Sequence, residues 1–252
     1  MPGAVTESGE CGDALTWTLD DKGTLIISGT GEMSRKTPFE RNGDVIRVII
    51  EDGVQSISDS AFNMCENMKE IRIPDSVTSI GRSAFSGCKS LAEISIPDGV
   101  SVIETDTFNY CRSLEKVRLP EGLTEIGGYS YEWCDKLKEL DIPSGVSYIG
   151  GGAFRNTSWL EQKQAEAPMV IINDILVDGS ACEGEITIPD SVKMLCESAF
   201  EDCVGATHIS VPEGITELPF EVFSGCVALR SVDIPESVTV IECCAFEDCV
   251  SL

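Results

Sequence analysis

Histidine and basic residues are scarce in this chain. Of 252 residues one is histidine, His208, and Lys and Arg together number 18 against 43 Asp and Glu, so the formal net charge is −25. A surface that follows nucleic-acid phosphates needs Lys and Arg, so nucleic acid is not an expected partner. The same deficit argues against electrostatic docking on an anionic membrane. A single histidine also leaves little room for acid–base or metal chemistry, so the composition disfavours an enzyme.

Long apolar runs and targeting signals are absent as well. No stretch approaches the ~18 consecutive apolar residues of a membrane-spanning helix, so no membrane insertion is expected. Residues 1–8 lack the basic and apolar regions of a secretory leader. Apolar residues still make up 42% of the chain and charged residues 24%, which is too apolar for a disordered protein and predicts a sizeable core.

A 23-residue repeat dominates what the sequence does contain. Branched aliphatic residues recur at this spacing, as in Ile71, Ile94 and Val117. An aromatic column recurs in the same register, with one step of 46: Phe62, Phe85, Phe108, Tyr131, Phe154, Phe200, Phe223 and Phe246. Several columns in phase over most of a chain predict a repeat protein.

The sequence pattern of each repeat predicts a short strand, a turn and a second short strand. In Ile94-Ser95-Ile96-Pro97 the alternation places both isoleucines on one face, and the proline ends the strand. An Ala-Phe pair follows in a helical or 3₁₀ turn. One unit cannot bury its apolar side chains alone, so the units must stack. The expected fold class is a repeat solenoid with a parallel β-sheet on one face and short strands and helical turns on the other.

These residues resemble the BspA-like, or Treponema-type, leucine-rich repeats. Residues 77–88, Val-Thr-Ser-Ile-Gly-Arg-Ser-Ala-Phe-Ser-Gly-Cys, and residues 91–97, Leu-Ala-Glu-Ile-Ser-Ile-Pro, carry that motif. The resemblance covers roughly four fifths of the chain. It implies an extracellular or surface-attached bacterial protein of anaerobes, used for adhesion and binding without catalysis or a cofactor. The implied partner is a protein or a glycan of unknown identity.

Two segments depart from the repeat. Residues 1–44 are expected to form an N-terminal cap, because Leu15 to Leu19 and Leu25 to Ile27 alternate around a turn like a β-hairpin. Residues 45–252 are the predicted solenoid. Within it, residues 155–185 lose the repeat's Phe, Cys and Pro columns and form a remodelled unit, with a hairpin around Asn173-Asp174.

The chain ends where a further strand is expected to begin. Leu252 occupies the column of Leu91 and Leu114, which suggests a piece of a longer array. An uncovered apolar end favours end-to-end association through the C-terminal repeat.

Twelve cysteines need an explanation. Seven share one column and predict a buried structural ladder of thiols: Cys65, Cys88, Cys111, Cys134, Cys203, Cys226 and Cys249. Their spacing makes a column rather than the clustered ligand set of a metal site. A Cys182–Cys196 disulfide remains open, because spacing does not supply the geometry that such a bond needs.

The outward face of the predicted sheet supplies the candidate binding residues. Exposure and column position single out Arg72, Arg118, Glu139 and Asp141 on this face, together with Trp159 near the interruption. Together they predict a rigid surface that makes many shallow contacts with a protein or glycan. The alternative without a ligand is a structural spacer that holds another domain away from a cell wall.

Two chemical alternatives are also visible in the columns. Glu185, His208 and Ser231 follow one another as carboxylate, imidazole and hydroxyl, which suggests an esterase. An open sheet offers no evident oxyanion donors, so this hypothesis is the weaker one. A column of turn carboxylates suggests calcium, although a solubilising edge explains it as well: Asp75, Asp98, Glu121, Asp190, Glu213 and Glu236.

Overall fold

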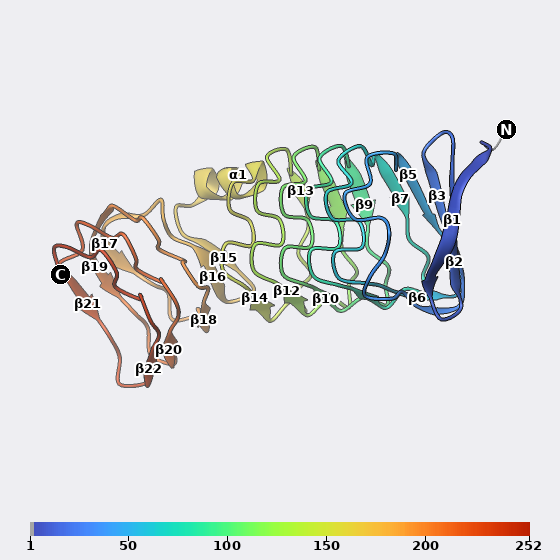
Figure 1. The fold of residues 1–252 in the computed structure, drawn as a ribbon. Helices are drawn as coiled ribbons and strands as arrows, with labels where there is room; N and C mark the ends of the chain where they lie inside the picture. Colours follow the sequence, from blue (N-terminus) through green and yellow to red (C-terminus); the bar gives the residue numbers. More distant parts are fainter. Residues whose placement is uncertain (1–2) are drawn as a thin grey trace. The chain divides into compact units, whose positions relative to one another are not determined.

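The computed structural model describes residues 3–252, which divide into two compact units (Figure 1). Unit 1 comprises the chain up to Val146 together with Ala153–Leu160. Unit 2 comprises Ser147–Gly152 and Glu161–Leu252. Both units consist of short strands that recur along the chain and stack into parallel ladders, so the predicted solenoid is confirmed.

One side of unit 1 is a ladder of parallel strands. Neighbouring strands pair residues 23 apart, such as Val48 with Ile71 and Ile94 with Val117. Alternation turns Val48, Ile94 and Val117 inward and leaves the polar residues on either side exposed. The strands are β3 (Thr24–Gly29), β5 (Arg47–Ile50), β7 (Glu70–Arg72), β9 (Glu93–Ser95), β11 (Lys116–Arg118) and β13 (Glu139–Leu140).

A second ladder runs along another side of unit 1. Its strands are two to four residues long because the chain soon bends away in each coil. Ile57 pairs with Ile80, and Ile103 pairs with Ile126. The strands are β4 (Gly31–Glu32), β6 (Val54–Ile57), β8 (Ser79–Ile80), β10 (Val102–Ile103) and β12 (Glu125–Ile126).

The N-terminal segment is an antiparallel meander joined to the first ladder. The predicted hairpin is present as β2 (Leu15–Asp20) and β3, with Trp17 opposite Ile27. An additional strand, β1 (Val5–Gly12), pairs with β2. Strand β3 then pairs in parallel with β5, so the meander continues directly into the ladder and covers its first turn.

The turns that carry the aromatic column form further hydrogen bonds between neighbouring coils. The N–H of Phe62 donates to the carbonyl of Ala84 (2.8 Å), and the N–H of Phe85 donates to that of Thr107 (2.9 Å). Each aromatic ring is buried and stacks on the next at 5.3–5.7 Å between centroids. The column in unit 1 consists of Phe39, Phe62, Phe85, Phe108, Tyr131 and Phe154.

A tryptophan closes each end of this aromatic column. Trp17 meets Phe39 edge-on, with centroids 5.5 Å apart and ring planes at 89°. At the other end Trp159 packs against Phe154 at 4.6 Å. The rings of unit 1 therefore have an aromatic neighbour on both sides along the whole column.

Unit 2 repeats the same construction over fewer turns. In its first ladder Ile186 pairs with Ile209 and Ile209 with Val232. In its second, Leu176 pairs with Leu195 and Leu218 with Ile241. The strands are β14 (Tyr148–Ile149), β15 (Val170–Ile172), β16 (Ile175–Asp178), β17 (Glu183–Thr187), β18 (Met194–Leu195), β19 (Gly205–Ser210), β20 (Glu217–Leu218), β21 (Ser231–Asp233) and β22 (Val240–Ile241).

The remodelled segment contains the predicted hairpin and an unpredicted helix. Strands β15 and β16 pair antiparallel around Asn173 and Asp174, whose φ angles of 47° and 65° suit a two-residue hairpin turn. Helix α1 (Ser158–Glu166) precedes them. Its N-terminus is capped by Thr157, whose hydroxyl oxygen accepts the Leu160 N–H at 3.1 Å.

Candidate functional site

The exposed side of the first ladder in unit 1 carries charged residues in a regular pattern. We call it the strand face and define it by the outward residues of β5 to β13 and the positions that follow them. Charges of opposite sign meet between neighbouring strands: Arg47 with Glu70, Lys116 with Glu139, and Arg118 with Asp98 at 3.7 Å. Arg118 also donates to Ser95 at 3.3 Å. Glu139 raises the pKa of Lys116 by accepting a hydrogen bond from it and by its negative charge.

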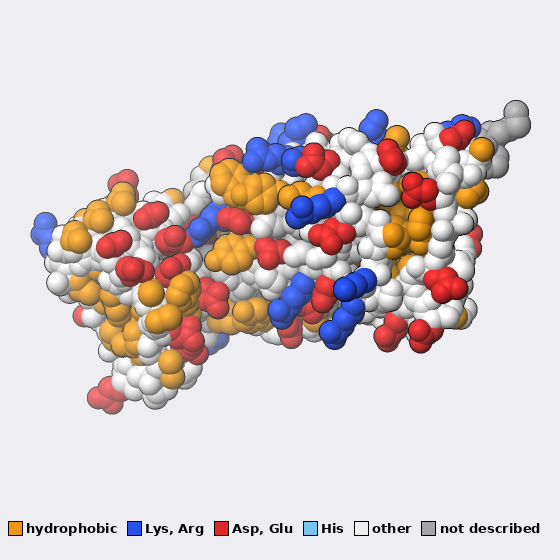
Figure 2. Space-filling view, viewed as in Figure 1, with side chains coloured by type: hydrophobic (Ala, Val, Ile, Leu, Met, Phe, Trp, Pro, Cys, Tyr) orange, Lys and Arg blue, Asp and Glu red, His pale blue; other side chains and the backbone are white. Residues whose placement is uncertain are grey.

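Four of the five candidate binding residues lie on the strand face. Arg72, Arg118, Glu139 and Asp141 are all exposed there. Two open grooves of about 550 and 480 Å³ cross this face. Lys116 and Glu139 line both, and Arg118 and Asp141 line the second. In the view of Figure 2, Lys and Arg side chains of unit 1 lie among Asp and Glu side chains, whereas the charged side chains seen on unit 2 are mostly Asp and Glu.

Trp159 is not exposed, contrary to expectation. Its side chain is 5% exposed and packs against Phe154, and its indole N–H donates to the Leu140 carbonyl at 3.0 Å. The residue lies near the point where the aromatic repeat is interrupted, so a large ring is needed there to cover Phe154. Trp159 is therefore part of the core of unit 1.

The suggested catalytic row has a different set of contacts. Glu185 is the strand neighbour of His208, but the imidazole makes its hydrogen bonds with other side chains than that of Glu185. Its Nδ1 lies 2.8 Å from the Ser231 hydroxyl, and its Nε2 lies 3.1 Å from that of Ser210 and 3.3 Å from an Asp233 oxygen. The carboxylate that meets the imidazole is thus Asp233. These side chains project from β19 and β21 on an outward sheet surface.

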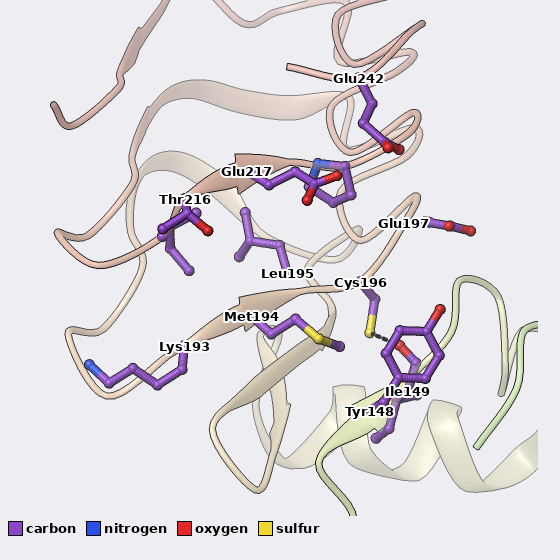
Figure 3. A pocket seen from close by; sticks show the side chains of 12 residues that line it. Tyr148, Ile149, Lys193, Met194, Leu195, Cys196, Glu197, Thr216, Glu217 and Glu242 are labelled. Carbon is purple, nitrogen blue, oxygen red and sulfur yellow. Dashed lines mark hydrogen bonds between the residues drawn. The ribbon is translucent and has the colours of Figure 1, made fainter. Parts of the chain in front are cut away.

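A pocket of about 310 Å³ lies within unit 2, on the side of its second ladder (Figure 3). Buried Ile149, Leu195 and Ile215 form an apolar floor. Cys196 belongs to the same floor, and its thiol donates to the Ile149 carbonyl at 3.0 Å, the dashed line in Figure 3. The exposed rim contains Tyr148, Lys193, Glu197, Glu217 and Glu242.

Carboxylates dominate the rim of that pocket. Desolvation by the surrounding rim raises the pKa of Glu217, and a hydrogen bond with Glu242 together with that neighbour's negative charge raises it further. Glu242 also accepts the Phe220 N–H at 3.1 Å. Residues 161–252 contain three basic residues, Lys163, Lys193 and Arg230, against 18 Asp and Glu. The rim is therefore suited to a positively charged organic group and not to an anion.

The cysteine column lines the interior next to the aromatic column. Six of its thiols donate to the carbonyl of the residue 26 positions earlier, as Cys88 does to Phe62 at 3.2 Å and Cys111 to Phe85 at 3.1 Å. The seventh, Cys203, donates to the Cys182 carbonyl at 3.1 Å. Burial raises the pKa of Cys65 to about 12 and the pKa of Cys88 well above its ordinary value. All twelve cysteines are free thiols, so the Cys182–Cys196 bridge left open by the sequence is not formed.

The described residues contain no metal centre and no membrane span. Across residues 3–252, no group of three or more His, Cys, Asp or Glu side chains is arranged to hold a metal ion. One of the turn carboxylates considered for calcium, Asp98, is instead the ion-pair partner of Arg118. No helix among the same residues is both long and apolar enough to cross a membrane.

Sequence analysis missed two groups of surface residues. The first is the pocket of unit 2, to which Tyr148 and Glu217 contribute from the second ladder. The second is a pair of stacked rings at the surface, exposed Tyr110 and half-buried Trp133. Their spacing of 23 is the sequence signal that marks them as neighbours.

A family model supports the repeat assignment. The model described as BspA type leucine rich repeat region matches residues 35–161 and 171–252. Among curated proteins, none matches this chain.

Several solved structures are similar to the chain. A leucine-rich repeat protein from T. pallidum is 25% identical, with 97% of this chain and 91% of that chain covered and a TM-score of 0.45. A leucine-rich cell surface protein from Faecalibacterium prausnitzii is 22% identical, covering 100% and 88%, with a TM-score of 0.44. The pneumococcal vaccine antigen PcpA is 16% identical, covering 93% and 71%, with a TM-score of 0.48.

Proposed function

Because the chain belongs to the BspA-type leucine-rich repeat family, we propose that it is a non-enzymatic binding module that acts at the cell surface or after secretion. Its ligand is a protein or a glycan, and its binding surface is the strand face of unit 1. Binding at this surface needs no cofactor, because the contacts come from charged side chains on a prebuilt sheet.

The observation that carries this proposal is the exposed array of charges of both signs on the strand face. Strands β7, β11 and β13, with the residue that follows β13, hold Arg72, Arg118, Glu139 and Asp141 in fixed positions above a packed core. Preformed positions reduce the ordering entropy that binding costs. The ion pairs on this face are exposed, so each contributes little to folding. Their charged groups are accessible to the surface of a binding partner.

The charge pattern favours a protein among the possible ligands. Both signs occur along neighbouring strands, as in Lys116 and Glu139, so a complementary surface must also carry both signs in register. Such matching supports specificity and association rate more than raw affinity. A uniformly charged polymer cannot match it. The open grooves suit a broad, shallow contact of the kind that protein interfaces make.

A charge-neutral replacement tests the surface. The variant Arg72→Ala, Arg118→Ala, Glu139→Ala, Asp141→Ala removes two charges of each sign, so the net charge stays the same. A matched control removes two ion pairs from other sides of unit 1: Glu66 with Lys89 (2.8 Å) and Arg82 with Glu104 (3.6 Å). Wild type and both variants are immobilised and exposed to arrays of extracellular-matrix proteins and of glycans.

The strand-face variant is expected to lose at least tenfold in affinity for the captured ligand, which corresponds to about 1.4 kcal/mol, and the control is expected to keep wild-type affinity. Equal capture by all three proteins would place the binding surface elsewhere. Capture of nothing by the wild type would favour the spacer alternative. The esterase alternative requires ester turnover that disappears in His208→Ala.

A further inference from the structure

Two aromatic side chains stack on the turn edge of unit 1, away from the strand face. Tyr110 and Trp133 occupy equivalent positions in successive turns, with ring centroids 5.9 Å apart and planes 18° from parallel. Tyr110 is 41% exposed and Trp133 is half-buried. They are therefore separate from the inward column, whose rings form the core.

The backbone at this position does not favour aromatic residues. Tyr110 and Trp133 have φ angles of 60° and 59°, in the left-handed region that bulky side chains rarely adopt. The same position in other turns of unit 1 holds Arg41 (59°), Met64 (60°), Gly87 (72°) and Asn156 (58°), of which glycine and asparagine tolerate this conformation best. This conformation is thus common to the coils, and what distinguishes Tyr110 and Trp133 is that two aromatic rings meet there at the surface.

An arginine completes the cluster. The guanidinium carbon of Arg112 lies 5.7 Å from the Tyr110 centroid and 5.8 Å from the Trp133 centroid, so the three groups form a nearly equilateral triangle. An ion pair with Asp135 at 3.7 Å helps to position it. A guanidinium has five N–H donors, so this pair leaves donors for a ligand.

We propose that Tyr110, Trp133 and Arg112 bind a pyranose ring of a neutral glycan. One face of such a ring is a sheet of C–H groups, which packs on aromatic rings, and its rim carries hydroxyls. The Arg112 N–H groups donate to those hydroxyls, and the Asp135 carboxylate accepts from them. The site goes beyond the proposed function, because it shares no residue with the strand face.

Other ligands that use aromatic stacking fit this cluster less well. A proline ring inserted between two aromatic rings needs a van der Waals contact of 3.5–4.0 Å on each side, or about 7–8 Å in all. The 5.9 Å separation leaves no such slot, so a proline ring cannot insert between Tyr110 and Trp133. Single-stranded nucleic acid and anionic glycans are disfavoured by the net charge of −25.

The tryptophans of the chain make the site directly observable. Trp17 and Trp159 are 8% and 5% exposed, so Trp133 is the one that a surface ligand reaches. The probes are hexasaccharides of β-1,4-linked glucose, β-1,4-linked N-acetylglucosamine and α-linked mannose. At least one is expected to shift the indole emission to shorter wavelength, to protect it from acrylamide quenching and to bind with a Kd on the order of 1 mM or tighter by calorimetry.

Variants with asparagine separate binding from folding. The double variant Tyr110→Asn, Trp133→Asn places asparagine at both positions, as at Asn156 in a later coil. Asparagine tolerates the left-handed backbone better than an aromatic residue does, so the melting temperature is expected to stay the same or rise. Calorimetric affinity for the sugar is expected to fall at least about tenfold, and Arg112→Ala is expected to weaken it as well. Tyr148→Asn, which removes an exposed aromatic of unit 2, serves as the control and is expected to bind normally.

Three outcomes would overturn the proposal. They are no binding of any hexasaccharide at about 10 mM, binding that survives the double asparagine variant, or a shift of Trp133 emission by a proline-rich peptide in place of a sugar. The strand-face variant described above is expected to bind the sugar normally. A failure of this proposal can therefore be told apart from a failure of the proposed function.

Discussion

The indole of Trp159 covers the ring of Phe154 at 4.6 Å and closes the aromatic column of unit 1. The indole N–H is also satisfied by the Leu140 carbonyl at 3.0 Å. Trp159 thus ends a stack that would otherwise expose the face of its last ring.

Replacing this ring should therefore destabilise unit 1. We expect Trp159→Ala to lower the free energy of unfolding by about 3–5 kcal/mol, and Trp159→Phe to lower it by less, because a smaller cavity remains. Urea denaturation measures both changes. Since the residue is buried, ligand capture by the folded variant should match the wild type, and a selective loss of capture would show that Trp159 contacts the ligand after all.

Tyr131 offers a substitution in the stabilising direction. It is the one tyrosine in a column of phenylalanines, and its fully buried hydroxyl has no hydrogen-bond partner in the described structure. Tyr131→Phe removes an unsatisfied polar group and keeps the ring, so we expect a gain of about 1–3 kcal/mol in the free energy of unfolding. A loss of stability would mean that the hydroxyl is bonded, for example to a buried water.

The position that precedes each ring of the aromatic column, which is alanine in most coils, offers two substitutions that can be compared. Ser130 is buried with an unsatisfied hydroxyl, whereas Thr107 at the same position one turn earlier donates to the Glu104 carbonyl at 2.7 Å. Ser130→Ala should stabilise and Thr107→Ala should destabilise, the latter by about 0.5–1.5 kcal/mol. If both changes have the same sign, burial and not hydrogen bonding controls this column.

The cysteine ladder predicts a loss of stability at alkaline pH. Burial raises the pKa of Cys88 well above its ordinary value, and raises that of Cys226 to about 12. The unfolded chain ionises these thiols above about pH 8.5, while the folded chain keeps them protonated. Their contribution is therefore complete below pH 8.5 and is lost as pH rises toward the folded-state pKa, at up to about 1.4 kcal/mol per thiol per pH unit.

Denaturation between pH 8 and pH 10 under reducing conditions measures that slope. Cys88→Ala is less stable at every pH because of its cavity, but its slope should be smaller by about one proton. An identical slope in the two proteins would show that this thiol does not titrate differently on unfolding. Tyrosine and lysine titrate alike in both proteins, so the comparison isolates the cysteine.

The imidazole cluster of unit 2 is expected to be catalytically inert. His208 contacts Ser231 through Nδ1, while Ser210 and Asp233 occupy Nε2, all on an outward sheet surface where water competes for any developing charge. We expect wild type and His208→Ala to hydrolyse p-nitrophenyl acetate at equal rates. A clear drop in the variant would restore the esterase hypothesis.

The repeat could be predicted because many positions carry the same information. Any two of Val48, Ile71 and Ile94 define the register, and stacking then follows from the apolar surface that one unit leaves uncovered. Strand β1 could not be found this way. Residues such as Glu7 and Ser8 are exposed and show no alternation, so only pairing with β2 stabilises the strand.

The side-chain contacts of the candidate site could not be predicted from the sequence in the same way. Columns place His208 beside both Glu185 and Ser231, but rotamers decide which neighbours it meets, and Asp233 is two residues farther along the neighbouring strand. Trp159 was misjudged for a related reason. The residue that covers the last ring of a column does not follow the repeat spacing. Trp159 can therefore be identified as that residue only from its contact with Phe154 in the structure.

The ladder bonds of unit 1 join residues one period apart, so its length is adjustable in whole steps. Excising residues 78–100 would connect Val77 to Ser101 and leave every remaining strand opposite a neighbour of its present kind. Excising one residue fewer would reverse the alternation and turn isoleucines toward water. Gene segments that encode one coil can thus be lost or duplicated cleanly, and each changes the reach of the scaffold by roughly 4.8 Å.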